Sequence, residues 1–346
     1  MPQKILLTGA SGYIAKHTAL QLLDAGFTLR ASVRNTAKAD ELRAALAPHL
    51  ADPAALEQRF ETVLLDLNDE AGWAAAAQGM DAIMHMASPF PMAPPKNEDD
   101  LIRPAVDGTL RALQAAADAG VTRFILTSSS VAIMDAELPE GRSVYNESDW
   151  TDPTKPSLRA YEKSKTLAEM AAWDFVAKTA PQIAMTVINP TLVTGPPLDA
   201  NFGTSVELIE RLLSGRDPML PRIGFPMVDV RDVALMHLRA LERPETAGQR
   251  YIGVQSFHWM PELGVALKAV YPSRKIATRT APSFLVRIMA LWDPAIRSVL
   301  PVLGIRKEGS NAKASAELGI EFRDALDAMR ATAAALIAFE QNKGKT

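Results

Sequence analysis

The stretch Lys4–Ala15, KILLTGASGYIA, decides the fold class of this chain. An apolar run leads into a turn that contains Gly9 and Gly12, with Ala15 at the position of a third small residue. In a dinucleotide-binding unit the first glycine permits the tight turn, and the second lets backbone N–H groups approach a pyrophosphate. The pattern therefore predicts a nucleotide site at the start of a helix; a purely structural turn is the alternative. The residues expected to line this site are Thr8, Gly9, Ser11, Gly12, Tyr13 and Ile14.

Short β-rich runs alternate with longer helical patterns through the first half of the chain. The β-rich runs are residues 4–9, 28–34, 61–67, 81–87, 123–129 and 184–190. This alternation predicts an α/β protein, a Rossmann doubly wound parallel sheet with helices on both faces.

The rhythm breaks after Pro190, where prolines and loops increase. We expect residues 1–190 to form an NADP-binding Rossmann domain to which 228–240 return, and 191–346 to form mainly a smaller α/β substrate-binding domain. The alanine-rich residues 317–346 are expected to form a helix on the outside.

Composition excludes several classes of function. The net charge of −3 gives no electrostatic reason to expect nucleic acid or an anionic membrane as a partner. The chain has no cysteine, which excludes disulfides and thiolate zinc sites and fits a cytoplasmic location. The five histidines show no metal-ligand spacing, so no metal is expected. The apolar tract 282–304 contains charged residues and prolines, so we expect no membrane span there but a segment that covers the substrate or an apolar contact surface. The protein is expected to be a monomer or homodimer.

Tyr161 and Lys165 lie four residues apart in AYEKSKTLAEMAAW, a stretch with strong helical character. Positions i and i+4 share a helix face, so the ammonium group is expected beside the phenol. A neighbouring positive charge favours phenolate, so we expect the pKa of Tyr161 to lie below its usual value of about 10. Such a tyrosine exchanges a proton with a carbonyl or alcohol oxygen. The alternative is a surface tyrosine beside a solvated lysine.

The residues after the second β-rich run indicate which nicotinamide cofactor binds. An NAD site has an acidic residue there for the ribose 2′-hydroxyl, but Ala31–Arg34 contains none. Arg34 is suited to pair with a 2′-phosphate and Lys38 to assist it, so the sequence favours NADP(H) as the cofactor. The alternative is that Arg34 is merely solvated. Asp66 and Leu67 end the third run, where they are expected to contact adenine; helix capping is the alternative for Asp66.

Several motifs together resemble one family. They are LLTGASGYIA, RASVRN, RFILTSSS, YEKSKTLAEMAAW, INPTLVTGP and AELGIEF. These pieces resemble the extended branch of the short-chain dehydrogenase/reductase superfamily, and within it the dihydroflavonol reductase, cinnamoyl-CoA reductase and aldehyde reductase group. The resemblance implies an NADPH-dependent reductase of aldehydes or ketones.

The resemblance also implies roles for individual residues. Among Ser128–Ser130 it selects Ser129 as the third catalytic residue, which holds the substrate carbonyl beside Tyr161, and it gives Lys165 a second contact with the nicotinamide ribose. His85 has no chemical role in this family and is expected in the core. The cofactor is further expected to contact Met86, Ala87, Ser88, Thr127, Pro190, Thr191 and Val193.

One departure from the family bears on the substrate. Flavonoid reductases have an asparagine where this chain has Met134, which is expected to contact the substrate with Ser129 and Tyr161. A thioether favours apolar groups, so an aldehyde, ketone or keto ester with few hydroxyl groups is expected. The alternatives are a hydroxysteroid-like secondary-alcohol dehydrogenase, a sugar-nucleotide epimerase, and a non-enzymatic NADP-sensing regulator.

Overall fold

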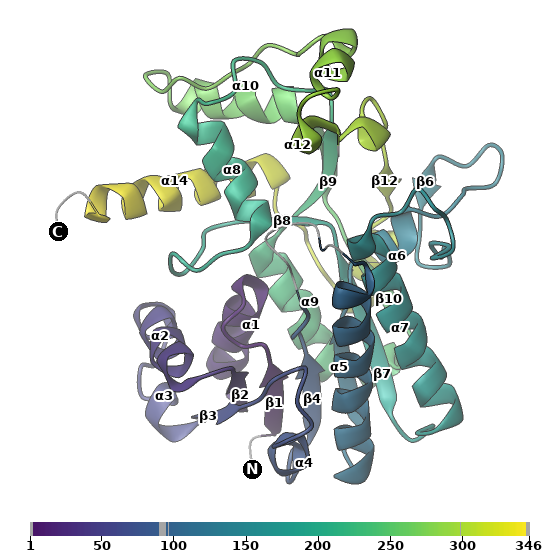
Figure 1. The fold of residues 1–346 in the computed structure, drawn as a ribbon. Helices are drawn as coiled ribbons and strands as arrows, with labels where there is room; N and C mark the ends of the chain where they lie inside the picture. The colour runs from purple at the N-terminus through teal and green to yellow at the C-terminus, as the bar shows by residue number, and fades with distance from the viewer. Residues whose placement is uncertain (1–2, 90–94, 96, 298, 344–346) are drawn as a thin grey trace.

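A seven-stranded parallel sheet organises the larger part of the molecule, and confirms the predicted Rossmann fold (Figure 1). The computed structural model describes residues 3–89, 95, 97–297 and 299–343. The strand order is β10-β7-β5-β4-β1-β2-β3, and every pairing is parallel. The strands are β1 (Lys4–Thr8), β2 (Thr28–Val33), β3 (Phe60–Leu64), β4 (Ala82–His85), β5 (Arg123–Thr127), β7 (Ala184–Pro190) and β10 (Arg250–Gly253).

Helices cover both faces of this sheet because its strands are apolar on both sides. Ile5 and Leu7 of β1 belong to one hydrophobic core, and Leu6 between them belongs to the other. The first core includes side chains of α1 (Tyr13–Asp24), α2 (Thr36–Leu46) and α9 (Val230–Glu242). The second includes side chains of α4 (Trp73–Ala77), α5 (Asp99–Asp118) and α7 (Ala160–Lys178).

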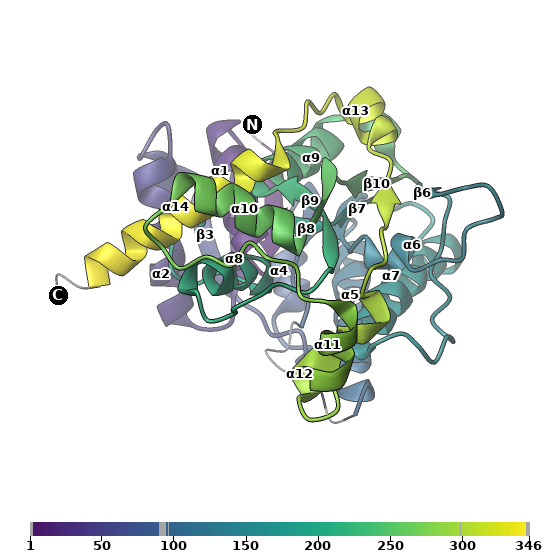
Figure 2. The same ribbon diagram turned by 90° about the horizontal axis from the view of Figure 1, so that it is seen from above.

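A second region lies above the large sheet in Figure 1. Its small sheet has the order β11-β9-β8, with β9 antiparallel to β11 and parallel to β8. These strands are β8 (Leu192–Thr194), β9 (Gly224–Asp229) and β11 (Ser256–Trp259), and the helices beside them are α8 (Thr204–Ser214), α10 (Met260–Val270) and α14 (Ala325–Lys343). The helix α14 differs from the expected outer helix, because Met329 and Leu336 are buried in the core that it shares with α8 and α10 (Figure 2).

Short elements complete the fold. They are η1 (Ala47–His49), α3 (Ala55–Gln58), α6 (Val131–Met134), β6 (Val144–Tyr145), η2 (Pro244–Thr246), α11 (Ser283–Met289), α12 (Pro294–Arg297), η3 (Leu300–Val302), β12 (Glu308–Gly309) and α13 (Ala312–Leu318). No helix of the described part of the chain has the length and apolarity needed to cross a bilayer.

The strand order creates a crevice at the carboxyl ends of β1 and β4. From β1 the chain proceeds to β2 and β3 on one side, and then to β4 on the other. In open α/β sheets, ligands bind where the strand order reverses in this way.

Candidate active site

The turn between β1 and α1 makes a close backbone approach. Gly9 has a φ of +66°, and a Cβ there would lie 2.7 Å from Cα of Ala87. Thr8 Oγ1 accepts hydrogen bonds from the N–H groups of Met86 and Ala87, at 3.1 and 3.2 Å, which holds the end of β4 against the turn. Gly12 caps α1 with no side-chain hydrogen bond to the first helical N–H groups. This is the geometry that a bound anion requires.

A cavity of about 380 Å³ opens beside this turn, and its walls come from strand ends far apart in the sequence. The expected residues that line it are Gly9, Ser11, Gly12, Tyr13, Ile14, Met86, Ser88, Thr127, Ser129, Tyr161, Lys165, Pro190, Thr191 and Val193. The structure therefore brings the predicted catalytic residues and most predicted cofactor contacts into one cavity.

Ser129 and Tyr161 are joined by a side-chain hydrogen bond. The pKa of Tyr161 is raised above its usual value, because burial disfavours phenolate more than the bond from Ser129 favours it. The expected lowering by Lys165 was wrong for the protein as it stands: i, i+4 spacing places the two side chains on one helix face, but burial dominates the titration.

Lys165 is the cation of the cavity. Burial lowers its pKa to about 8, and the carboxylate of Glu169 opposes that change. No described residue forms a hydrogen bond or ion pair with its ammonium group. The Ser128 hydroxyl, also at the cavity, is buried without a hydrogen-bond partner in the described part of the chain. Both groups are therefore available to a ligand.

Two predicted phosphate contacts lie outside the lining of this cavity. Arg34 follows β2, is exposed, and forms no ion pair with any described residue. Lys38 lies in the first turn of α2, where its ammonium group pairs with Glu41 at 2.5 Å.

The predicted adenine contacts also lie outside the cavity. The strand β3 ends at Leu64, so Asp66 and Leu67 follow it rather than end it. Asp66 Oδ1 accepts a hydrogen bond from the N–H of Asn68 at 2.8 Å, which makes it a turn residue. Leu67 packs against Gly108 of α5.

Met134 is placed differently from the expected substrate contact. It is 3% exposed and packs with Ile133, Ile252 and Val254 in a small core. The one-turn helix α6 directs it into this core, and it does not line the cavity, so the structure does not support the predicted contact between Met134 and the substrate. His85 is buried as expected, and its Nδ1 lies 2.9 Å from Thr8 Oγ1.

A further wall of the cavity was missed by the sequence analysis. It consists of Asn201, Phe202, Gly203, Thr204, Ser205 and Glu207, and Ala15 and Ser128 also line the cavity. Three side chains on one face of α1 tie the preceding segment to the cofactor turn: Tyr13 donates to the Gly195 carbonyl at 2.7 Å, Lys16 donates to the Asn201 carbonyl at 2.9 Å, and His17 Nε2 lies 2.9 Å from the Pro196 carbonyl. Polar groups at helical spacing in the sequence were the available signal.

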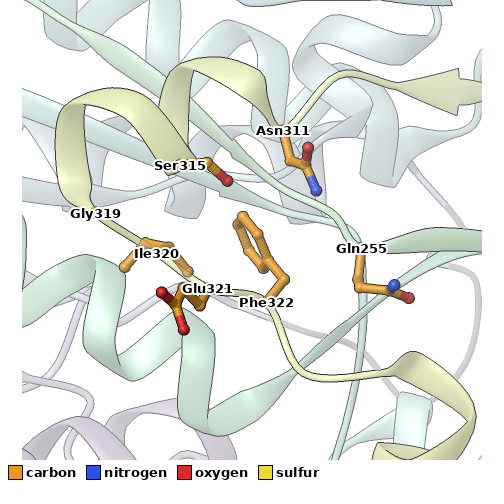
Figure 3. A pocket seen from close by; sticks show the side chains of 7 residues that line it. All are labelled: Gln255, Asn311, Ser315, Gly319, Ile320, Glu321 and Phe322. Atoms are coloured by element: carbon orange, nitrogen blue, oxygen red, sulfur yellow. The ribbon is translucent and has the colours of Figure 1, made fainter.

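A second cavity, of about 470 Å³, has a different set of lining residues. It is lined by Gln255, Asn311, Ser315, Gly319, Ile320, Glu321 and Phe322 (Figure 3). The Phe322 ring lies amid the labelled side chains, and Asn311 Nδ2 already donates to the Val254 carbonyl at 3.0 Å. Among these described residues there is no tyrosine, lysine or histidine, so we assign the chemistry to the first cavity.

Comparison with known proteins identifies the family. The profile of the NAD dependent epimerase/dehydratase family matches residues 5–252. The chain belongs to this family. A ketoreductase of Aspergillus niger is 35% identical over 301 residues, which cover 82% of this chain and 86% of the relative. Cinnamoyl-CoA reductase 1 of Arabidopsis thaliana is 32% identical over 277 residues, covering 80% of this chain and 77% of that enzyme.

A solved structure agrees with this assignment. The methylglyoxal/isovaleraldehyde reductase of yeast, complexed with NADPH, superposes with a TM-score of 0.80 at 27% identity and covers 98% of this chain and 99% of that one. These findings confirm the predicted membership of the extended short-chain dehydrogenase/reductase branch. This chain is an NADP-dependent oxidoreductase.

Proposed function

We propose that this protein reduces the carbonyl group of a small aldehyde, ketone or keto ester through Ser129, Tyr161 and Lys165. One observation carries the proposal: the hydrogen-bonded Ser129–Tyr161 pair and Lys165 line the same cavity as the glycine turn. A carbonyl group bound in this cavity can therefore lie next to both a hydride donor and a proton donor.

The residues present fit NADPH. A side chain at Gly9 would fill the close approach to Ala87, and the first N–H groups of α1 have no side-chain cap. We propose that these groups hold the pyrophosphate, that Arg34 and Lys38 hold the 2′-phosphate, and that Lys165 contacts the nicotinamide ribose. When bound, NADPH supplies the hydride.

The protein's own residues handle the substrate oxygen. The Ser129 hydroxyl orients the carbonyl, and Tyr161 gives its proton to the oxygen to complete the alcohol. A phenol whose pKa is raised by burial is fully protonated at neutral pH, which suits it to donate in the reductive direction. The ammonium group of Lys165 stabilises the phenolate that remains.

The ketoreductase and cinnamoyl-CoA reductase relatives favour reduction over the alternatives. An alcohol dehydrogenase would use the same residues in reverse, and an epimerase would also need a nucleotide-sugar site. A regulator without activity is disfavoured because the relatives are enzymes. We retain a Rossmann domain of residues 1–190, with 228–240 returning to it, and a substrate-binding part of 191–346; β10 extends the large sheet beyond that division.

The test is Tyr161→Phe, which removes the proton and leaves the ring. We expect NADPH oxidation across a panel of aldehydes, ketones and keto esters to fall at least about a hundredfold, with NADPH binding by fluorescence within about twofold of wild type. Tyr271→Phe is the matched control and should remain active, because Tyr271 is partly buried against the core of the second region and does not line the cavity. Wild-type turnover in Tyr161→Phe would remove this residue from the mechanism.

A further inference from the structure

A buried ion pair lies behind the catalytic residues. Glu169 is 1% exposed and follows Lys165 by one helical turn on α7. Its Oε1 accepts a hydrogen bond from Arg250 Nε of β10 at 2.5 Å. The Arg250 guanidinium carbon lies 3.6 Å from the centroid of the Trp150 ring, and its Nη1 donates to the Asp149 carbonyl at 3.0 Å.

The pair is connected to Ser129. The other carboxylate oxygen of Glu169 accepts a hydrogen bond from Asn189 Nδ2 at 2.7 Å, and the same Nδ2 donates to the Ser129 backbone carbonyl at 3.1 Å. Asn189 is fully buried in β7, which lies between β5 and β10 in the sheet (Figure 1). The carboxylate therefore orients an amide whose function is to hold the catalytic serine's backbone.

The pair also faces Lys165. Glu169 is the group that raises the pKa of Lys165 against the effect of burial. His85 also interacts electrostatically with Lys165, but burial lowers the pKa of His85 to about 3 and keeps it neutral. Tyr161, on the same helix face, is a protonated phenol at neutral pH. The negative charge near Lys165 thus comes from Glu169.

We propose that Glu169 is a positioning residue of this site: through Asn189 it fixes the backbone of Ser129, and one helical turn from Lys165 it supplies the carboxylate that balances the ammonium group. This inference rests on the proposed function of Ser129 and Lys165. Stability alone does not explain the pair, because an apolar pair of similar volume serves a core equally well. The network even leaves Asn189 Oδ1 and Arg250 Nη2 without hydrogen-bond partners among described residues.

The test uses three variants of the full chain. Glu169→Gln removes the charge but leaves Arg250 unpaired, and the double variant Glu169→Gln/Arg250→Gln removes both charges. Asn189→Leu breaks the link to Ser129 and keeps the carboxylate. Asp232→Asn is the control for a general loss of stability, because the buried carboxylate of Asp232 on α9 pairs with the exposed Arg323 away from the cavity.

Two readouts are measured. The titration of Lys165 is followed by trace acetylation with acetic anhydride and peptide mass spectrometry from pH 6 to 10, which needs no turnover. The values of kcat and KM are measured over the same range, together with unfolding in urea.

We expect the double variant to move the Lys165 midpoint down by about one pH unit, since burial then acts unopposed, and Glu169→Gln to move it at least as far because Arg250 keeps its charge. The alkaline fall in kcat should move with it, and kcat near pH 7.5 should drop roughly threefold, because the protonated fraction of Lys165 falls by that factor, with little change in the KM for NADPH. The double variant should regain stability relative to Glu169→Gln but not the pH profile. Asn189→Leu should lower kcat without moving the Lys165 midpoint.

If Glu169 had a purely structural role, the double variant would regain the wild-type pH profile together with its stability. That result would overturn the proposal. An unchanged Lys165 midpoint in both Glu169 variants would overturn it as well. Unchanged kcat in Asn189→Leu would refute the link to Ser129. Failure of the proposed function is separate, because it appears as absent turnover in the wild-type protein while the acetylation measurement still reports on Glu169.

Discussion

At the scale of single residues, Arg34 and Lys165 are two cations in opposite surroundings. Arg34 is exposed just after β2, whereas Lys165 lines the cavity together with Tyr161 and burial lowers its pKa to about 8. An exposed guanidinium can pair with a phosphate through two parallel hydrogen bonds, and it needs no change in its own titration to do so. These cations therefore suit different tasks, phosphate recognition for Arg34 and proton chemistry for Lys165.

Removing the Arg34 side chain should raise the KM for NADPH and leave the KM for NADH nearly unchanged. A charge-assisted pair lost from a partly solvated site corresponds to about tenfold or more in affinity. Steady-state kinetics of Arg34→Ala with both cofactors measures this. Arg103→Ala is the control, because Arg103 is a similarly exposed arginine on α5 whose side chain is 74% exposed. Equal increases for both cofactors would exclude the 2′-phosphate role.

The residues also show what spacing alone predicts. Two side chains four positions apart share a helix face, and Tyr161 and Lys165 both line the cavity as expected. The direction of the Tyr161 titration depends on burial, which arises from neighbours distant in sequence. The position of Met134 differs from the prediction for the same reason, because the neighbours that bury it, Ile252 and Val254, are distant in sequence.

At the scale of elements, the β1–α1 turn is determined by local chemistry. Its conformation requires a glycine at position 9 for two reasons: the φ angle is positive, and the backbone of Ala87 lies too close for a side chain. Six of the seven strands of the large sheet correspond to runs identified in the sequence. The strand β10 was missed because its four residues, RYIG, lack a distinctive pattern and pair with β7 only through long-range contacts.

Gly9→Ala should therefore disrupt the cofactor site. The added methyl group would lie 2.7 Å from the backbone of Ala87. The alanine would also have to adopt the left-handed conformation, which itself costs about 1–2 kcal/mol. We expect loss of NADPH binding by calorimetry and a lower Tm. The control is Gly79→Ala, because Gly79 has a similar φ of +73° but nothing within 4 Å of the added Cβ. Gly79→Ala should lose some stability and bind NADPH normally; normal binding in Gly9→Ala would contradict the assignment of the turn.

At the scale of the whole molecule, three histidines are buried where elements meet. His17 joins α1 to the segment after β8, His85 joins β4 to β1, and His237 joins α9 to β5. Burial lowers the pKa of His17 and His237 to about 4, and that of His85 to about 3. The sequence identified His85 as a core residue, but these partners lie in elements whose packing only the fold defines.

Acid should therefore destabilise the fold before its carboxylates titrate fully. The unfolded chain binds protons at its histidines below about pH 6.5, whereas the folded chain does not until about pH 4 or lower. Stability is thus lost as pH falls through this window, by about 1.4 kcal/mol per pH unit for each buried histidine. The raised pKa values of Glu147 and Asp232 act in the opposite direction and offset part of the loss.

Urea unfolding at pH 7, 6 and 5 measures this dependence. His85→Gln retains an acceptor for Thr8 and cannot be protonated, so its stability should fall less steeply with pH than that of the wild-type protein, even if it is less stable at pH 7. His49→Gln, at an exposed position in η1, should retain the wild-type slope. Equal slopes in the wild-type protein and in His85→Gln would show that His85 is accessible to protons in the folded state. The tight contact between the ends of β1 and β4 would then have to open without unfolding, and the cofactor turn that depends on it would share that mobility.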